Sequence, residues 1–119
     1  MATMILRASL TEDSFKNLLE RDTGRRDIIK ALVERVGLKF IAIYFSATKA
    51  NFMVIVEGDP SKLPALELIY LSSGGYVGLE SEVMYDPEEW QKIRDLARKV
   101  APSFEAPNRD EIDRMLLDE

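Results

Sequence analysis

The sequence predicts one α+β domain built on a four-stranded antiparallel sheet. Four segments are rich in β-branched and aromatic residues that alternate between two faces, and two others repeat apolar residues at helical spacing. Their order along the chain is strand, helix, strand, strand, helix, strand. The length of 119 residues fits a single domain with one hydrophobic core.

The first strand is predicted over Thr3 to Leu10, followed by a helical region. Alternation places Met4, Leu6, Ala8 and Leu10 on one face and Ile5, Arg7 and Ser9 on the other. Thr11 is typical of a helix N-cap, because its hydroxyl can accept a bond from the first turn. Gly24 interrupts the helical pattern, which resumes at Arg25 and ends at Gly37 as a C-cap glycine.

The next two strands form a predicted hairpin, Leu38 to Ser46 and Asn51 to Glu57, joined by a short polar turn. Strict alternation assigns Phe40, Ala42 and Tyr44 to one face of the first hairpin strand and Ile41, Ile43 and Phe45 to the other. Both faces of the hairpin are therefore apolar.

A second helix is predicted after Gly58-Asp59-Pro60, with Ser61 as its N-cap. Its expected inward residues are Leu63, Leu66, Ile69 and Tyr70. The last strand runs from Tyr76 to Tyr85, and alternation assigns Val77, Leu79 and Val83 to one face and Gly78, Glu80 and Glu82 to the other.

The C-terminal part carries the strongest helix-start signal, Asp86-Pro87-Glu88-Glu89. The helix that follows repeats apolar residues at Trp90, Ile93, Ala97 and Val100. We assign residues 1–101 to the α+β domain with this helix. Residues 102–119 are a linker and a short acidic helix that holds Ile112, Met115 and Leu116.

This order of elements is the split βαβ, or ferredoxin-like, arrangement. Right-handed crossovers place both helices on one face of the sheet, with the first and third strands central and the fourth beside the first. The other face would be open to water, yet the hairpin makes it apolar. Two sheets packed face to face in a homodimer or higher homo-oligomer would cover it, and so would the chain's own segment from Pro102 onward.

Composition excludes several classes of chemistry. The chain has no cysteine and no histidine, which removes thiolate metal sites, cysteine nucleophiles and histidine-dependent triads. We expect no metal and no cofactor. A formal charge of −5 and a single arginine cluster, at positions 21, 25 and 26, argue against nucleic-acid binding. Without an apolar run of ~20 residues or a signal-peptide pattern, we expect a cytoplasmic protein and no membrane partner.

The segment from about Leu6 to Trp90 resembles the GYD-domain family of mostly uncharacterised small proteins. The resemblance is carried by Leu10-Thr11-Glu12-Asp13, the long helix Arg25 to Val36, Gly37-Leu38-Lys39 and Val54-Ile55-Val56-Glu57, together with the closing strand before Asp86. The Gly-Tyr-Asp motif of that family is not retained, since the hairpin turn reads Thr48-Lys49-Ala50-Asn51. The resemblance implies a ferredoxin-like fold of the dimeric α–β barrel kind and no established activity.

The candidate functional residues lie on the face that the helices leave open. Arg7 of the first strand should neighbour Glu80 or Glu82 of the fourth. These charges form either an ion pair that fixes a subunit interface or a polar corner of a ligand pocket. Tyr44 and Asn51 are further ligand-binding candidates, and packing and the hairpin turn are the simpler roles for them.

Three functions are compatible with these features. The first is an oligomeric small-molecule-binding or regulatory module. The second is a cofactor-free enzyme, such as a monooxygenase or isomerase, by analogy with other dimeric α–β barrels. The third is a pure protein-interaction subunit.

Overall fold

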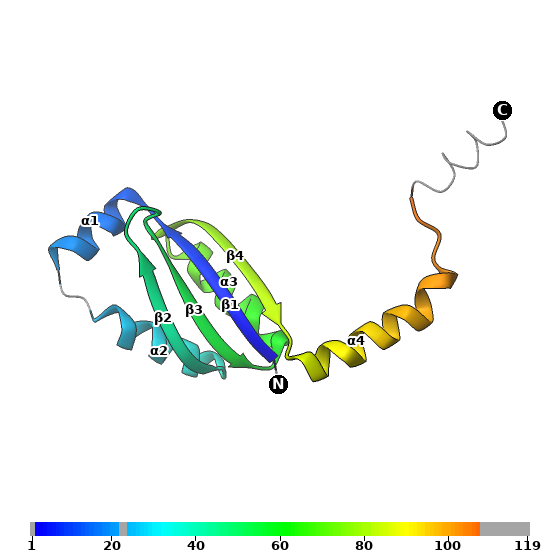
Figure 1. Cartoon of the computed structure of the whole chain (residues 1–119). Coiled ribbons are helices and arrows are strands. Elements are labelled where there is room, and N and C mark those ends of the chain that lie inside the picture. Colours follow the sequence, from blue (N-terminus) through cyan, green and yellow to red (C-terminus); the bar gives the residue numbers. More distant parts are fainter. Residues whose placement is uncertain (1, 22–23, 108–119) are drawn as a thin grey trace, which may run out of the picture. The chain divides into compact units, whose positions relative to one another are not determined.

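The computed structural model describes residues 2–21 and 24–107, which divide into two compact units, Met1–Met84 and Tyr85–Glu119. The first unit contains β1 (Ala2–Leu10), α1 (Glu12–Glu20), α2 (Arg25–Val36), β2 (Lys39–Ser46), β3 (Asn51–Gly58), α3 (Leu63–Ser72) and β4 (Tyr76–Met84), as Figure 1 shows. The second contains α4 (Pro87–Val100) and a short 3₁₀ turn, Ala101–Ser103. The predicted domain boundary after residue 101 stays a prediction.

The strand order in the sheet is β2-β3-β1-β4, and every neighbouring pair is antiparallel. β1 and β3 are therefore central and β4 lies beside β1, which confirms the ferredoxin-like topology predicted from the sequence. The register places Arg7 opposite Met53 of β3 and Glu80 of β4. The register therefore shows which residues lie beside one another on the open face, across all four strands.

The hydrophobic core lies between one face of the sheet and the helices α2 and α3, which cover that same face (Figure 1). Its fully covered side chains come from both layers and include Met4, Leu6, Val33, Val54, Val56, Leu66 and Tyr70. Burial of apolar surface is worth roughly 25 cal/mol per Å². This layer is accordingly the main source of stability in the first unit, and it fixes which sheet face is left open.

A bulge in β2 changes which of its side chains face the core. Phe40 pairs with Val56, but Ala42 pairs with Ile55, so the register shifts by one residue between them. Because one extra residue reverses the alternation, Phe40 joins the core face and Tyr44 faces the open side. The prediction that Phe40, Ala42 and Tyr44 share a face was wrong for Phe40.

A second irregularity lies at the start of β4. Ser9 pairs with Gly78, whereas Leu10 pairs with Tyr76, so Val77 is the extra residue. Tyr76 packs against the core, and Val77 is 71% exposed. The prediction that Val77 shares a face with Leu79 and Val83 was wrong for Val77, and the bulge is the reason.

The helix ends of the first unit follow local chemistry, with one exception at the start of α3. As predicted, the Thr11 hydroxyl oxygen accepts the Ser14 N–H at 3.2 Å, and Gly37 ends α2 with a φ of 97°. Ser61 is not the cap of α3: the Asp59 carboxylate accepts the Ser61 N–H at 3.0 Å in a 3₁₀ turn, and α3 follows that turn. Ile69 was predicted inward but is 40% exposed.

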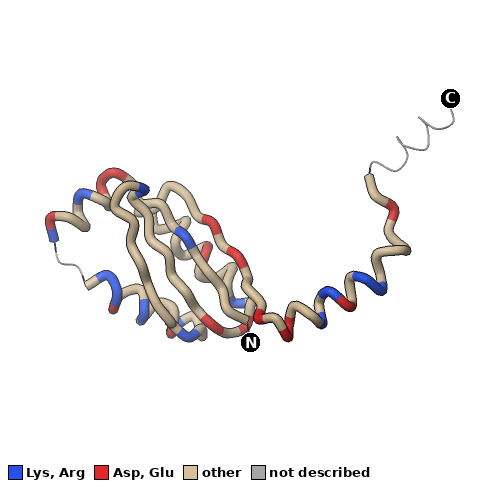
Figure 2. Tube along the Cα trace, in the orientation of Figure 1, with Lys and Arg blue, Asp and Glu red and all other residues tan. Residues whose placement is uncertain are grey.

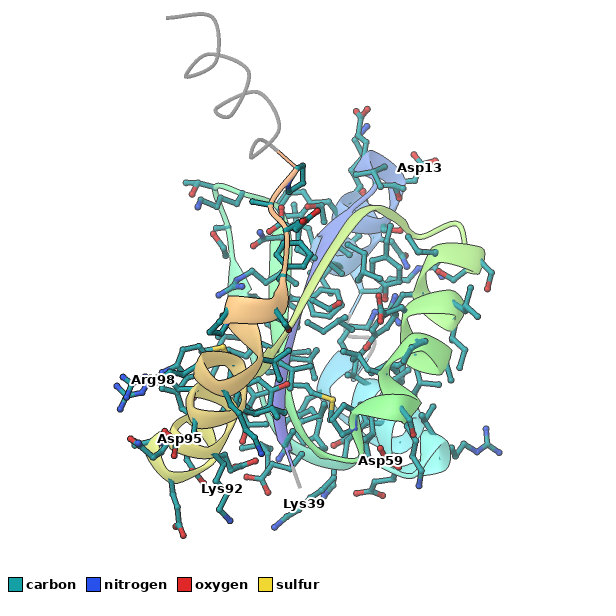
Figure 3. All side chains as sticks on the ribbon, turned by 90° about the vertical axis from the view of Figure 1, so that its right-hand side faces the viewer. Asp13, Lys39, Asp59, Lys92, Asp95 and Arg98 are labelled. Carbon is teal, nitrogen blue, oxygen red and sulfur yellow. The ribbon has the colours of Figure 1, made fainter. Side chains whose placement is uncertain are left out.

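The second unit is described through its helix α4. The Asp86 carboxylate accepts the Glu89 N–H at 2.8 Å, and Pro87 occupies the first turn, as the sequence predicts. Figure 3 marks three charged side chains of this helix, Lys92, Asp95 and Arg98. None of the α4 side chains is buried. The predicted terminal helix with Ile112, Met115 and Leu116 lies outside the described residues.

In the described part of the chain, no helix is both long and apolar enough to cross a bilayer.

Candidate functional site

The centre of the open sheet face is an apolar patch. The register aligns Ile5 with Ile55, Ile55 with Ala42, and Met53 with Tyr44. Tyr44 is 59% exposed, and the other four are partly covered. Figure 2 shows the same distribution, since the middles of β2 and β3 carry no charged residue while β1 and β4 do. These five residues are called the apolar patch below.

A charged pair borders the apolar patch on the side of β4. Arg7 lies opposite Glu80 in the register, but its Nη1 donates to Oε1 of Glu82, two residue pairs along, at 2.7 Å. The two paired side chains are 42% and 47% exposed. An ion pair so accessible to water contributes at most about 1 kcal/mol to stability, so it adds little to the stability of the first unit.

A polar groove of about 510 Å³ opens next to this pair, toward the hairpin turn. The residues around it include Leu79 and six others from β1, β3, β4 and the turn: Arg7, Ser9, Lys49, Asn51, Gly78 and Glu80. The groove therefore combines two cations, a carboxylate, a hydroxyl and an amide. We call these six residues the polar groove.

Three of the five residues predicted from the sequence meet in the polar groove: Arg7, Asn51 and Glu80. Glu82 is tied to it through its ion pair with Arg7, while Tyr44 lies in the apolar patch. Sequence reasoning missed Ser9, Lys49 and Gly78. The signal for Ser9 and Gly78 was the strand register, which aligns Asn51, Ser9 and Gly78 in one row.

A second hollow lies on the opposite, helix-covered face, near the same end of the sheet. Three rings, Phe45, Phe52 and Tyr76, line it, and a fourth, Tyr70 of α3, packs against Phe52 and Tyr76 without lining it. The Tyr70 and Tyr76 rings are 5.2 Å apart between centroids and nearly perpendicular, an arrangement that aromatic pairs favour. We call these four rings the aromatic cluster.

The tyrosine hydroxyls of the aromatic cluster are unusual for a core. Tyr70 is 2% exposed, and its hydroxyl has no hydrogen-bond partner in the described residues. Burial raises the pKa of Tyr70 and of Tyr76, and the guanidinium of Arg25 opposes both shifts. A buried hydroxyl without a partner costs about 1–3 kcal/mol.

The residues that the structure describes contain no group of three or more acidic side chains that could hold a metal ion. The candidate sites can instead supply hydrogen bonds and charges: guanidinium, ammonium, carboxylate and amide groups in the polar groove, and the side chains of Arg25 and Tyr76 in the lining of the hollow. Both arrangements suit recognition of a small polar or amphiphilic molecule.

Comparisons with known proteins give one structural likeness. No family model matches the chain, and no curated protein matches it. The resemblance to the GYD-domain family is not confirmed and stays a prediction. A solved structure described as the crystal structure of antibiotic biosynthesis monooxygenase is similar over 72% of this chain and 98% of its own, with 12% sequence identity and a TM-score of 0.48. We draw no activity from this likeness.

Proposed function

We propose that the protein is a homodimeric small-molecule-binding module whose subunits pack through the open sheet face. The observation that carries this proposal is the composition of that face, which joins the apolar patch directly to the polar groove. Large apolar side chains exposed in contiguous groups mark contact surfaces. A polar groove at their border is where a ligand would reach both subunits.

Self-association explains the apolar patch most simply. A two-fold axis places the same surface of each subunit against the other, so one apolar face covers a second identical one. Stable interfaces of this kind bury more than about 1,000 Å² in total and have an apolar centre with a polar rim. The open face has this layout, with Ile5 and Ile55 at its centre and the pair of Arg7 and Glu82 at its side.

The polar groove supports a ligand that carries groups of both signs. Arg7 and Lys49 offer positive charge, Glu80 offers negative charge, and Ser9 and Asn51 offer hydrogen bonds. The cations would receive an anionic group, and the carboxylate would receive a donor or a cation. Gly78 leaves room, because a β-carbon built on it would project beside the Ser9 side chain at 3.8 Å.

Native mass spectrometry of the protein purified from its own host tests both parts of the proposal. We expect twice the chain mass, with a small additional mass bound to it. Arg7→Ala and Gly78→Val should each remove the additional mass, the first by deleting a charge and the second by filling the polar groove. Arg35→Ala, on the last turn of α2, is the control that should retain it.

The outcomes separate this function from its alternatives. A monomer at micromolar concentration would contradict the dimer. A dimer that never retains a small molecule would instead support a pure interaction subunit. The alternative of a cofactor-free enzyme stays a prediction, and it would require turnover of the retained molecule.

A further inference from the structure

Helix α4 of the second unit carries an exposed stripe of large apolar side chains. Trp90 is 56% exposed, Leu96 is 65% exposed, and Ile93 and Val100 are 39% and 53% exposed. Large apolar side chains that share one surface mark a site of contact with a partner. The spacing of these residues and the charges beside them indicate which partner the stripe fits.

The two ends of α4 are stabilised by its own sequence. The Asp86 carboxylate accepts the Glu89 N–H at 2.8 Å at the start of the helix. Glu88 and Glu89 lie in the first turn, and Arg98 and Lys99 lie in the last. Charges in this order are favourable for the helix dipole. The stripe is therefore presented by a helix with favourable ends, although none of its side chains is buried.

The apolar residues of α4 repeat in steps of three and four. Trp90, Ile93, Ala97 and Val100 occupy positions a, d, a and d of two heptads, and Leu96 at position g borders them. The positions on the far side of the helix, b, c and f, are all polar or charged, and Figure 3 labels three of them. They are Glu88, Gln91, Lys92, Asp95, Arg98 and Lys99. This pattern is the seam by which two α-helices pack along each other.

The charged residues beside the seam are complementary between two copies of α4. In a parallel pair, position g of one helix faces position e of the other, five residues further on. Glu89 of one copy would thus lie beside Arg94 of the second, and two-fold symmetry makes this pair twice. Within its own chain, Arg94 donates to Oε1 of Gln91 at 3.3 Å, and neither Arg94 nor Glu89 forms an ion pair with another described residue.

The same charges disfavour an antiparallel pair. That arrangement would place Trp90 of one copy against Val100 of the other, and Ile93 against Ala97. Position e then faces position e, so the guanidinium groups of the two Arg94 side chains would lie near each other. Like charges across an interface are costly, and the parallel orientation avoids them.

We propose that α4 of one subunit packs in parallel against α4 of a second subunit. This inference rests on the proposed homodimer, because two heptads are fewer than the roughly three or four that indicate a coiled coil on their own. Within a dimer, the second helix is present at an effective concentration of roughly millimolar. A short seam is sufficient under that condition, and it adds a second contact to that of the open sheet face.

Disulfide trapping in the full chain tests the proposal, because the chain has no cysteine of its own. Ala97→Cys places a thiol at the centre of the seam, where it faces its own copy. A disulfide joins Cα atoms about 4.4–6.8 Å apart. Arg98→Cys, one residue further and on the far side of the helix, is the matched control. In a glutathione redox buffer, we expect Ala97→Cys to form the covalent dimer at least about tenfold faster than the control.

Charge reversal in the Ala97→Cys protein tests how the two helices recognise each other. Glu89→Arg and Arg94→Glu each place like charges side by side twice in the pair, so each should slow disulfide formation about fivefold. The double reversal restores opposite charges and should restore the rate. Glu88→Arg makes the same change of charge in the first turn but at the outer position f, so it should leave the rate unchanged.

Three results would overturn the proposal. They are equal trapping of Ala97→Cys and Arg98→Cys, a double reversal that does not restore the rate, and faster trapping between Ile93→Cys and Ala97→Cys in a mixture than within Ala97→Cys alone. The last result would indicate an antiparallel pair. Sedimentation equilibrium of the reduced variants separates this failure from that of the proposed function. Dimers without selective trapping overturn the α4 pair alone, whereas monomers overturn both.

Discussion

Ile55→Glu is the substitution that most directly tests whether the open sheet face is an interface. Ile55 lies on the central strand β3, between Ile5 of β1 and Ala42 of β2, so it occupies the middle of the apolar patch. Its side chain is already partly covered in the single subunit. The substitution therefore removes only the share of burial that association adds, and it introduces a carboxylate there.

The magnitude follows from burial and charge. Complete burial of an isoleucine side chain is worth about 1.5–3 kcal/mol, so about half of that, roughly 1 kcal/mol, is lost per copy. A two-fold interface contains the substitution twice. Two carboxylates without partners add further cost on losing water. We expect dimerisation to weaken by at least about 3 kcal/mol, which is more than a hundredfold in Kd.

Sedimentation equilibrium between micromolar and submillimolar protein measures this change. Leu68→Glu is the matched control, because Leu68 is 68% exposed on α3, on the helix side of the sheet. The control should dimerise like the wild type. A wild-type protein that stays monomeric throughout, or an Ile55→Glu protein that dimerises like the control, would refute the reasoning.

Two further predictions concern the core. Leu66→Ala should lower the free energy of unfolding by about 3 kcal/mol, because Leu66 is 0% exposed between α3 and the sheet; urea denaturation measures the loss, and a change as small as that of Leu68→Ala would contradict it. Alkaline pH should destabilise the first unit, because burial raises the pKa of Tyr70 above its ordinary value of 10.0. The folded protein then keeps a proton that the unfolded chain releases, so this stabilisation is complete below about pH 10 and is lost as the pH rises further. Urea unfolding between about pH 8 and pH 11 should show the decline, and Tyr70→Phe should flatten it.

Much of the fold could be predicted because the relevant signals are local. The Thr11 and Asp86 caps and the C-cap at Gly37 each depend on a few neighbouring residues, and all three are observed. The order of elements then leaves few topologies once right-handed crossovers are required. The observed strand order is the one that follows from this rule.

The candidate site could be predicted only in part. The neighbourhood of Arg7 and the acidic residues of β4 follows from strand order, and the ion pair with Glu82 agrees with it. Tyr44 does not line the polar groove, because the bulge in β2 and the position of that edge strand place it in the apolar patch. Lys49 lines the polar groove from the hairpin turn, where the alternation of strand residues does not predict to which side a side chain points.

The sequence by itself determined the class of fold and most of the helix ends. It also showed that the sheet carries more apolar surface than one layer of helices can cover. Only the tertiary structure decided which side chains occupy each face. The two bulges, at Ile41 and Val77, shift the alternation of side chains by one residue. Because such a shift costs little free energy in the strand itself, the local sequence pattern does not predict it. The aromatic cluster also depends on the tertiary structure, because it joins β2, β3, α3 and β4 through packing between residues far apart in the chain.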